Sequence, residues 1–401
     1  MNILYITQYF YPEICAPSDR ALANVRYLSS KGHNLTIIAE IPNHPKGVIF
    51  PGYRGKIIAT EKKDRLFINR VWVLTSPKKN FTTRILFYVS FMFSGLICSL
   101  LRWRKYDIVY ISSPPLFVGI IGIVLNKLFK RTQIVFEVRD LWPKSAIVLG
   151  ELKNTKIIKL SELLETKIYN ISSLIVSITK GIHDEISGRY QGKSIFIPNG
   201  VDLHHYGNIK KNKDSNLSKF IVVYAGTHGL IHGLEIIIRA AEILKNKDIY
   251  FEFYGDGPVK ENLIDKSHTL GLNKVRFFDS VGFKEISNHL QNASVGLSTT
   301  KKLKLCKGSI PVKIFSYMAC NLPVIISGWG ESVDIIKKAD CGIVTPPENV
   351  EKLVNAILWM KENPSKRIKM GLNGRKFIEK NYNRRTQAQE LEKKLILMTE
   401  N

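Results

Sequence analysis

Short segments rich in large apolar residues recur along this chain, separated by loops and helical patterns. They lie at residues 2–7, 35–39, 107–112, 133–138, 174–177 and 194–198, and then at 220–224, 249–254, 275–278, 293–298, 322–326 and 341–345. Strands that are apolar along most of their length are buried on both faces, and their alternation with helices is typical of parallel sheets. We therefore expect an α/β protein with doubly wound sheets, whose ligands bind at the carboxyl ends of the strands.

The composition narrows the range of partners. The 401 residues suffice for two domains, and 45% hydrophobic and 23% charged residues are typical of a folded globular protein. The formal net charge is +25, so acidic partners are expected, such as nucleotide phosphates, anionic lipid or nucleic acid. The sequence has no zinc spacing, RNA-binding signature or basic arm, and we therefore do not expect nucleic acid as a partner.

The cysteines and the first residues indicate the compartment. The five cysteines are widely scattered and form no Cys-x-x-Cys pair, which argues for a reducing compartment and against a structural metal. The first ten residues, MNILYITQYF, have no basic region ahead of their apolar run. They predict a first strand and not a signal peptide.

The stretch KKLKLCKGSIPVKIFSYMACNLPVIIS, residues 301–327, predicts a basic loop, a helix, a turn and a buried strand. Gly308 gives a flexible entry, Ser309 an N-cap, and Pro311 suits the first helical turn. Lys313 in that turn is unusual, because a cation at the positive end of the helix dipole costs a few tenths to ~1 kcal/mol. An anion bound between the helix start and the lysines of the loop would reverse this cost, so we predict a phosphate site with Lys313 as its point charge. The alternative is that Lys313 points into water.

A glycine-rich turn follows the strand at 220–224. Gly226, Gly229 and Gly233 stand between this strand and the next helix, where backbone N–H groups can approach an anion. The spacing is not the dinucleotide fingerprint. His228 and His232 would add hydrogen bonds to the anion; the alternative is that each is a capping or core histidine. Upstream, residues 198–200 form a Pro-Asn-Gly turn signal that we interpret as a linker between two domains.

The first half offers polar candidates at the ends of its strands. Ser18 is expected to cap the helix after the first strand, and Arg20 on that helix either faces the interdomain cleft or is solvated. His44 lies in a long Pro- and Gly-rich loop, which is either functional or mobile, although a histidine alone proves nothing. Arg139 and Asp140 follow the strand at 133–138 and are cleft candidates; the alternative is a salt bridge that closes a loop.

Residues 81–103 form the most apolar region of the chain. The 17 residues from 85 to 101 carry no charge, with Arg84 before them and Arg102, Arg104 and Lys105 after them. Three alternatives remain: a buried helix of the sheet layer, a helix in the plane of a membrane, or a true span. The strand that begins at residue 107 disfavours a span, whereas the basic flanks and aromatic residues favour a helix that lies on an anionic leaflet.

The arrangement of these motifs resembles family 4 of the retaining glycosyltransferases, which have the GT-B fold. The resemblance covers nearly the whole chain and rests on PNGVD at 198–202, YAGTHGLIHGLE at 224–235, FYGDGP at 253–258 and the PVKIFSYMA–PVI run at 311–325. The loop at 41–53, the helix at 81–101 and FEVRDLWPKSAIVLG at 136–150 are similar to the bacterial surface-polysaccharide branch, which includes transferases of N-acetyl-L-fucosamine.

The resemblance implies two Rossmann-like βαβ domains that face a cleft: an acceptor domain at 1–200 and a donor domain at 201–381. A C-terminal helix at 382–401 would pack back on the first domain. The donor would be a UDP-sugar, bound without metal or other cofactor, and the acceptor a lipid-diphosphate-linked saccharide. The enzyme would act in the cytoplasm, peripherally on the inner face of the bacterial membrane, in O-antigen, capsule or exopolysaccharide biosynthesis.

The family pattern also assigns residues to the donor. The diphosphate would lie against the glycine turn (Gly226, Thr227, His228, Gly229 and His232) and the helix start (Gly308, Ser309 and Lys313), and the nucleoside near Gly255, Asp256, Val281 and Ser316. The chain departs from the pattern where the family often has Arg and Lys, since Thr227 and His232 stand there; Lys313 is the candidate replacement. Gly308 and Ser316 replace two family glutamates, and the second of these usually binds the ribose.

The expected chemistry is electrostatic. Retention by same-face attack is implied by the resemblance, and catalysis would stabilise the leaving diphosphate through Lys313, His228 and Arg139. Arg139 replaces a family histidine and cannot act as a base; Asp140 would orient the sugar or acceptor. Two other functions remain: a GT-B sugar-nucleotide epimerase, which needs a convergent acid and base, and a non-catalytic relative that binds lipid or a partner transferase.

Overall fold

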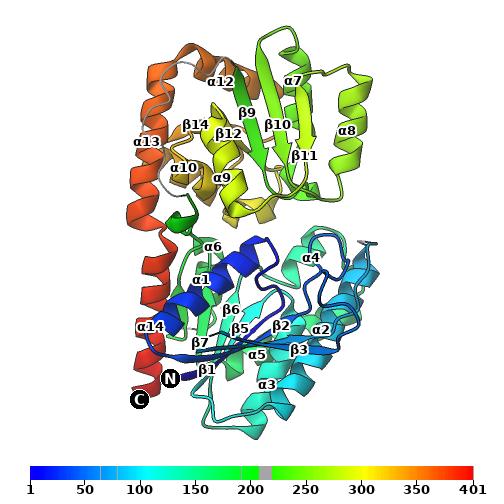
Figure 1. The fold of residues 1–401 in the computed structure, drawn as a ribbon, viewed down its shortest axis with the longest axis vertical. Helices are drawn as coiled ribbons and strands as arrows, with labels where there is room; N and C mark the ends of the chain where they lie inside the picture. Colours follow the sequence, from blue (N-terminus) through cyan, green and yellow to red (C-terminus); the bar gives the residue numbers. More distant parts are fainter. Residues whose placement is uncertain (64, 79, 191, 207–218, 401) are drawn as a thin grey trace. The chain divides into compact units, whose positions relative to one another are not determined.

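The computed structural model describes residues 1–63, 65–78, 80–190, 192–206 and 219–400, which form two compact units (Figure 1). The first unit comprises Met1–Pro198 together with Arg384–Asn401, and the second comprises Asn199–Asn383. Each unit is an α/β domain built on one sheet, as the recurrence of apolar segments predicts. The predicted architecture of two α/β domains is thereby confirmed, including the return of the C-terminal helix to the first unit.

The first unit contains a sheet of eight strands in the order β3-β4-β2-β1-β5-β6-β7-β8. All neighbours are parallel except β3 and β4. The strands are β1 (Asn2–Thr7), β2 (Asn34–Glu40), β3 (Ile58–Lys63), β4 (Leu66–Val71), β5 (Ile108–Ser113), β6 (Gln133–Val138), β7 (Leu174–Ser177) and β8 (Ser194–Phe196). The sequence did not predict the hairpin of β3 and β4, which extends the sheet at one edge.

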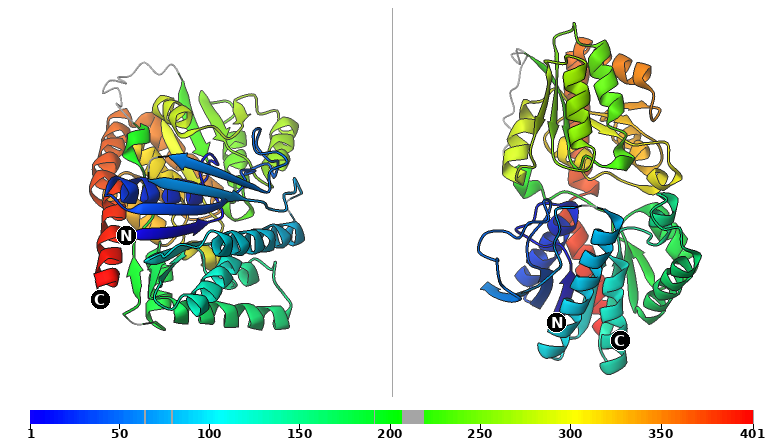
Figure 2. Two further views of the ribbon diagram at one scale, coloured as in Figure 1. Left: turned by 60° about the horizontal axis from the view of Figure 1, so that its bottom comes forward. Right: turned by 90° about the vertical axis from the view of Figure 1, so that its right-hand side faces the viewer.

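Helices cover both faces of this sheet. They are α1 (Ala16–Ser30), α2 (Phe81–Leu101), α3 (Gly119–Leu128), α4 (Lys144–Val148), α5 (Thr155–Ile171), α6 (Lys180–Ser187) and α14 (Arg384–Glu400). Leu4 and Ile6 of β1 belong to the core that α2, α3 and α5 close, whereas Ile3 and Tyr5 belong to the core under α1 and α14. The alternation of side chains along a strand thus separates two helix layers, and Figure 2 shows α2 and α3 side by side in one of them.

The second unit is an all-parallel sheet of six strands in the order β11-β10-β9-β12-β13-β14. The strands are β9 (Phe220–Ala225), β10 (Ile249–Tyr254), β11 (Val275–Phe278), β12 (Val295–Thr299), β13 (Val324–Ser327) and β14 (Gly342–Thr345). The helices are α7 (Glu235–Ile243), α8 (Lys260–Thr269), α9 (Phe283–Asn292), α10 (Lys313–Ala319), α11 (Glu331–Ala339), α12 (Val350–Glu362) and α13 (Pro364–Asn381). The chain places β10 and β11 on one side of β9 and the later strands on the other, so the strand order reverses between β9 and β12. In open α/β sheets this switch point is where ligands bind.

The last helix completes the first unit. α14 lies beside α1 (Figures 1 and 2), and its Leu391 and Leu395 enter the core that contains Ile3. At its first residue, the Arg384 guanidinium forms a buried ion pair of 2.7 Å with Asp19 of α1. The return of the chain is therefore fixed by apolar packing and by a charge pair.

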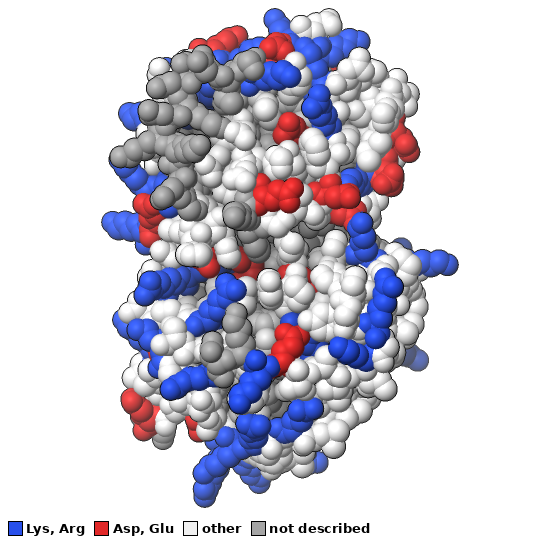
Figure 3. All heavy atoms as spheres, viewed as in Figure 1, with Lys and Arg blue, Asp and Glu red and all other residues white. Residues whose placement is uncertain are grey.

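Positive charge is spread over the molecule. Figure 3 shows Lys and Arg side chains distributed over the face in view, with Asp and Glu in smaller groups. This agrees with the 59 basic and 34 acidic residues of the sequence.

Two predicted helix caps are wrong. α1 begins at Ala16 with Cys15 at the N-cap position, and Ser18 lies buried within its first turn. α10 begins at Lys313 after Val312, and Ser309 precedes it in extended backbone, after a 3₁₀ turn at Lys304–Gly308. A side-chain cap requires the residue just before the first helical turn, and neither serine stands there.

Arg20 is not solvated, so that predicted alternative is wrong. The side chain is buried, and its Nε donates to Glu137 over 2.7 Å while its two Nη groups donate to the carbonyls of Pro198 and Ile197. Tyr110 and Ser112 also donate to the Glu137 carboxylate. Burial alone would raise the pKa of Glu137, but the nearby Arg20 and Arg139 guanidinium groups hold that pKa below its ordinary value. Arg20 thus joins α1, β6 and the end of the first unit.

The apolar region at 81–103 forms α2, whose Asn80 side chain caps it by accepting from the Thr83 N–H. Among the described residues, α2 is the helix long and apolar enough to cross a membrane. One side, with Phe91, Met92 and Cys98, packs into the core of the first unit. The other side leaves Phe93 57% and Ile97 55% exposed, so α2 is not a wholly buried helix of the layer.

We predict that Arg20→Ala destabilises the first unit by about 3 kcal/mol, because it leaves the Glu137 carboxylate buried without its cation. In a domain of this size, the thermal midpoint should fall by about 6–12 °C. Differential scanning calorimetry of the whole chain measures this. Arg26 on the same helix is exposed, and Arg26→Ala is the matched control, with an expected change below about 2 °C. Equal midpoints for the two variants would contradict the assigned role of Arg20.

Candidate functional site

The turns after β9 and β10 stack directly on one another at the switch point of the second sheet. The Gly226 N–H donates to the Tyr254 carbonyl over 2.8 Å, and the His228 N–H to the Asp256 carbonyl over 2.9 Å. Gly226 and Gly255 have φ angles of 147° and 141°, which L side chains rarely adopt. A Cβ on Gly255 would collide with the Gly226 carbonyl. Glycine is therefore required for this close approach of two backbones.

Lys313 reaches from the start of α10 over this glycine turn. Its Cε would lie 2.7 Å from a Cβ on Gly226, and its Nζ donates to the Tyr224 hydroxyl over 2.7 Å. The Tyr224 hydroxyl in turn donates to the Thr227 carbonyl over 2.8 Å. The ammonium also lies 4.1 Å from the centre of the Tyr224 ring. The alternative that Lys313 points into water is wrong.

The ammonium of Lys313 has no anionic partner among the residues that the structure describes. Burial lowers its pKa to about 7, because the charged form loses water without gaining a carboxylate. A cation held in this way gains free energy from an anion that enters the site, because the anion supplies the missing counter-charge. This arrangement makes the turn after β9 and the start of α10 the candidate anion site of the second unit.

The helix dipole contributes less than the sequence predicts. α10 spans Lys313–Ala319, because the chain before it is a 3₁₀ turn and an extended segment. The predicted site residues Gly308 and Ser309 therefore lie outside the helix, at the end of that turn. The ammonium of Lys313 therefore remains as the main positive charge at the glycine turn.

The two histidines of the turn are neutral and partly or wholly buried. The ring of His228 is fully buried and lies edge-on to Phe253 and Phe277, and neither of its nitrogens is bonded within the described chain. Burial and then the nearby Lys260 lower its pKa to about 4. Burial and then Lys313 lower the pKa of His232 to about 2. Of the predicted roles for His228, the structure therefore supports that of a core histidine, and the residue lies beneath the turn.

The residues predicted to hold the nucleoside occupy the same edge of the sheet. Asp256 accepts from the Gly257 N–H over 2.7 Å, and Val281 packs beside the core of the second unit. The Ser316 hydroxyl accepts from the Tyr206 hydroxyl over 2.8 Å. Ser316 thus has a protein partner, and one of its lone pairs is occupied.

Sequence reasoning missed polar groups at the end of β12. Ser298 and Thr300 are buried, and their hydroxyl oxygens have no hydrogen-bond partner in the described chain. Thr299 donates to the His232 carbonyl over 2.6 Å and so joins β12 to the glycine turn. The sequence contains a signal for these polar groups, because three consecutive hydroxyl residues stand at the end of an apolar segment at the switch point. Tyr224 was missed because the end of an apolar strand resembles core.

The candidates of the first unit lie at the carboxyl ends of its strands. Arg139 and Asp140 follow β6; the Arg139 Nε is unbonded within the described chain, and Asp140 accepts from the Ser145 hydroxyl over 2.8 Å. Burial raises the pKa of Asp140 and lowers that of Arg139. The His44 ring packs edge-on against Tyr9, with centroids 5.2 Å apart.

Two buried carboxylates near His44 were not predicted. Glu13 accepts from the backbone N–H groups of Asn43 and His44, each over 2.9 Å, and Glu40 accepts from the Asn43 side chain. Burial, and the proximity of Glu13, raise the pKa of Glu40 well above its ordinary value. Burial also raises the pKa of Glu13, and its hydrogen bonds anchor the start of the long loop after β2.

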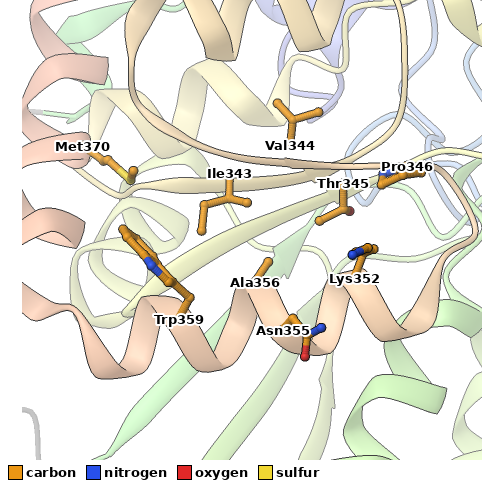
Figure 4. Close-up of a pocket in the computed structure, with 9 residues that line it drawn as sticks. All are labelled: Ile343, Val344, Thr345, Pro346, Lys352, Asn355, Ala356, Trp359 and Met370. Atoms are coloured by element: carbon orange, nitrogen blue, oxygen red, sulfur yellow. The ribbon is translucent and has the colours of Figure 1, made fainter.

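The second unit also contains a pocket that is separate from this site. A pocket of about 390 Å³ lies between β14 and α12, lined by Ile343, Thr345, Trp359 and others (Figure 4), and it includes none of the predicted residues. A search of the described residues finds no group of three or more His, Cys, Asp or Glu that could hold a metal ion.

Family models match almost the whole chain. The model described as Glycosyltransferase Family 4 matches residues 20–205, and the model described as Glycosyl transferases group 1 matches residues 206–377. The two models meet between residues 205 and 206, a few residues beyond the boundary of the two units. The chain is thereby shown to be a transferase enzyme.

One curated relative matches along nearly its full length. It is the Escherichia coli (strain K12) protein whose name describes a colanic acid biosynthesis glycosyl transferase, WcaI, with 23% identity over 90% of this chain and 94% of the relative.

Solved structures share the fold. Sucrose-phosphate synthase from Thermosynechococcus elongatus superposes with a TM-score of 0.76 at 15% identity, over 99% of this chain and 98% of that chain. Anabaena HepE in complex with UDP superposes with a TM-score of 0.70 at 14% identity, over 98% and 99% of the two chains.

We predict that a nucleoside diphosphate binds more weakly as the pH rises from 7 to 9. The empty site loses the proton of Lys313 through a pKa of about 7, so each further pH unit should lower the affinity by up to about tenfold. Isothermal titration calorimetry at each pH measures this, and Lys313→Gln is the control that should abolish the slope. A slope that Lys313→Gln retains would assign the titration to another group.

Proposed function

We propose that this chain transfers a sugar from a UDP-sugar to a lipid-linked saccharide. The chain is a family 4-like GT-B glycosyltransferase, since two family models meet end to end over residues 20–377. The sugar we propose is an N-acetylated amino sugar such as N-acetylfucosamine, as the motifs of the first half suggest. The pathway we propose is that of a surface polysaccharide, such as O-antigen, capsule or exopolysaccharide. The name of WcaI, which refers to colanic acid biosynthesis, supports a polysaccharide product.

The observation on which the donor proposal depends is the position of Lys313. Its ammonium is bonded to Tyr224 beside Gly226, at the switch point of a parallel sheet, and no described carboxylate neutralises it. A diphosphate is the leaving group of a nucleotide sugar and gains negative charge as the glycosidic bond breaks. A fixed cation at that place stabilises the transition state more than the ground state. The HepE complex with UDP, which has the same fold, supports a uridine nucleotide.

We propose a reaction with retention of configuration and without metal. The bond from the anomeric carbon to the diphosphate oxygen breaks, and the bond to the acceptor oxygen forms on the same face. The acceptor hydroxyl gives its proton to the departing diphosphate. In this scheme Lys313 stabilises the diphosphate together with the backbone N–H groups of the glycine turn other than those of Gly226 and His228, which bond to carbonyls. Arg139 is a further cation, and Asp140 orients the sugar or the acceptor.

We place the acceptor on the first unit and the enzyme on the inner face of the bacterial cytoplasmic membrane. The exposed side of α2, with Phe93 and Ile97, would lie in the plane of an anionic leaflet, with the basic residues at its end facing the headgroups. A lipid-diphosphate-linked acceptor would then be reached at the membrane surface.

We predict micromolar binding of UDP and at least tenfold weaker binding of GDP by calorimetry. Lys313→Ala should weaken UDP binding by about tenfold or more, because it removes a charge-assisted hydrogen bond. Lys337→Ala, an exposed lysine on α11, is the control and should bind as the unmodified chain does. Binding of neither nucleotide, or unchanged binding by Lys313→Ala, would contradict the donor site.

We predict that Lys313→Ala lowers the rate of sugar transfer to a lipid-linked acceptor by about 10²–10³, the loss typical for one transition-state donor. Chromatography of the products measures transfer. Incubation with the donor alone distinguishes the epimerase, which needs no acceptor and would convert one sugar nucleotide into another. Absence of turnover across a panel of UDP-amino sugars would contradict the proposed donor.

A further inference from the structure

The helix layer that carries α2 has a second exposed apolar stripe, on α5. Leu160 is 68% exposed, Leu163 is 67% exposed and Ile157 is 50% exposed. These residues stand on the outer side of the helix, because Ser161, Ile168 and Tyr169 on its inner side are buried. Large aliphatic side chains that stand together on a surface mark an interaction site.

Lysines stand in line with this stripe. Lys156, Leu160, Leu163 and Lys167 follow one another at spacings of four, three and four residues, which places them along one face of the helix. Neither lysine forms an ion pair with a carboxylate of the described chain, and Lys153 and Lys159 are likewise exposed. A lysine beside an exposed leucine can extend its aliphatic stem along the apolar surface and keep its ammonium at the boundary with water.

The stripes of α2 and α5 belong to one layer. Phe91 of α2, Ile121 of α3 and Ile168 of α5 enter the same core against Leu4 and Ile6 of β1, so the three helices cover the same face of the sheet. α3 lies between the other two, and up to residue 126 its outer side carries no charge. An ion pair between Arg84 at the start of α2 and Glu151 just before α5 joins the two stripes at one end.

We propose that the outer side of α5 is a second membrane contact, which lies on an anionic lipid leaflet together with α2. The inference rests on the membrane association proposed above and adds a surface to it. Charge complementarity selects this partner: the stripe combines leucines with Lys156 and Lys167, which pair with no carboxylate of the described residues, and the whole chain carries a net charge of +25. Two parallel stripes would also fix the rotation of the first unit about α2, so that the carboxyl ends of its strands keep a constant orientation to the lipid surface.

Flotation with phosphatidylcholine vesicles, with and without phosphatidylglycerol, tests the contact on the full chain. Leu160→Gln with Leu163→Gln removes the apolar stripe while keeping good helix formers, and the partition coefficient should fall by about tenfold or more. Lys156→Gln with Lys167→Gln should lower it by about fivefold for each lysine, and only in vesicles with phosphatidylglycerol. Ile368→Gln with Leu372→Gln, on exposed positions of α13, is the matched control and should float as the unmodified chain does.

Each outcome shows whether the outer side of α5 binds the lipid surface. Unchanged flotation of the Leu160 and Leu163 variant would overturn the α5 contact. If the variant with Phe93→Gln and Ile97→Gln also floats unchanged, the membrane association of α2 is overturned too. If light scattering shows a dimer that the Leu160 and Leu163 variant converts to a monomer, the stripe binds a second copy and the lipid contact is overturned. UDP titration of the same variants in lipid-free buffer reports on the donor site alone, so a failure of the donor proposal is distinguished from a failure at this surface.

Discussion

The candidate site of the second unit depends on the close packing of two backbone turns. The turn after β9 lies on the turn after β10, and glycines at 226 and 255 permit the approach. Because no side chain fills this space, the Lys313 ammonium can extend over the turn and bond to Tyr224. The same packing covers the ring of His228. The electrostatics of the site thus follow from a steric condition on the backbone: the Lys313 ammonium remains beside the turn, with no carboxylate among the described residues to neutralise it.

The sequence predicts the buried parts of this fold better than its edges. The strands with nearly continuous apolar sequence were predicted, because burial selects for them, whereas β4 (LFINRV), in which Asn69 and Arg70 interrupt the apolar run, was missed. β3 was missed, since its sequence IATEKK carries charges on an edge strand that faces water. The caps at Ser18 and Ser309 were wrong because capping depends on the backbone angles of a single residue, and composition does not determine these.

For the site, Lys313 was predictable because a cation at a helix start is locally unfavourable. Its partner Tyr224 lies 89 residues earlier, and the contact exists only once β9 and α10 are adjacent. Arg20 illustrates the opposite error: a charged residue near a strand end suggested a ligand, whereas its ligand is Glu137, 117 residues away. Glu13 and Glu40 gave no signal in the sequence, since each is one carboxylate in a loop or at a strand end. Only the tertiary structure brings such groups together.

The return of α14 to the first unit has a consequence for synthesis on the ribosome. The first 198 residues emerge first, but the core under α1 lacks Leu391 and Leu395 until the last segment of the chain has been made. Asp19 likewise waits for Arg384. An N-terminal domain usually folds before the next domain is synthesised, but the first unit cannot complete its fold at that stage here. The second unit, which is continuous from 199 to 383, can finish folding first, and the apolar side of α1 in the nascent first unit stays uncovered until α14 has been synthesised.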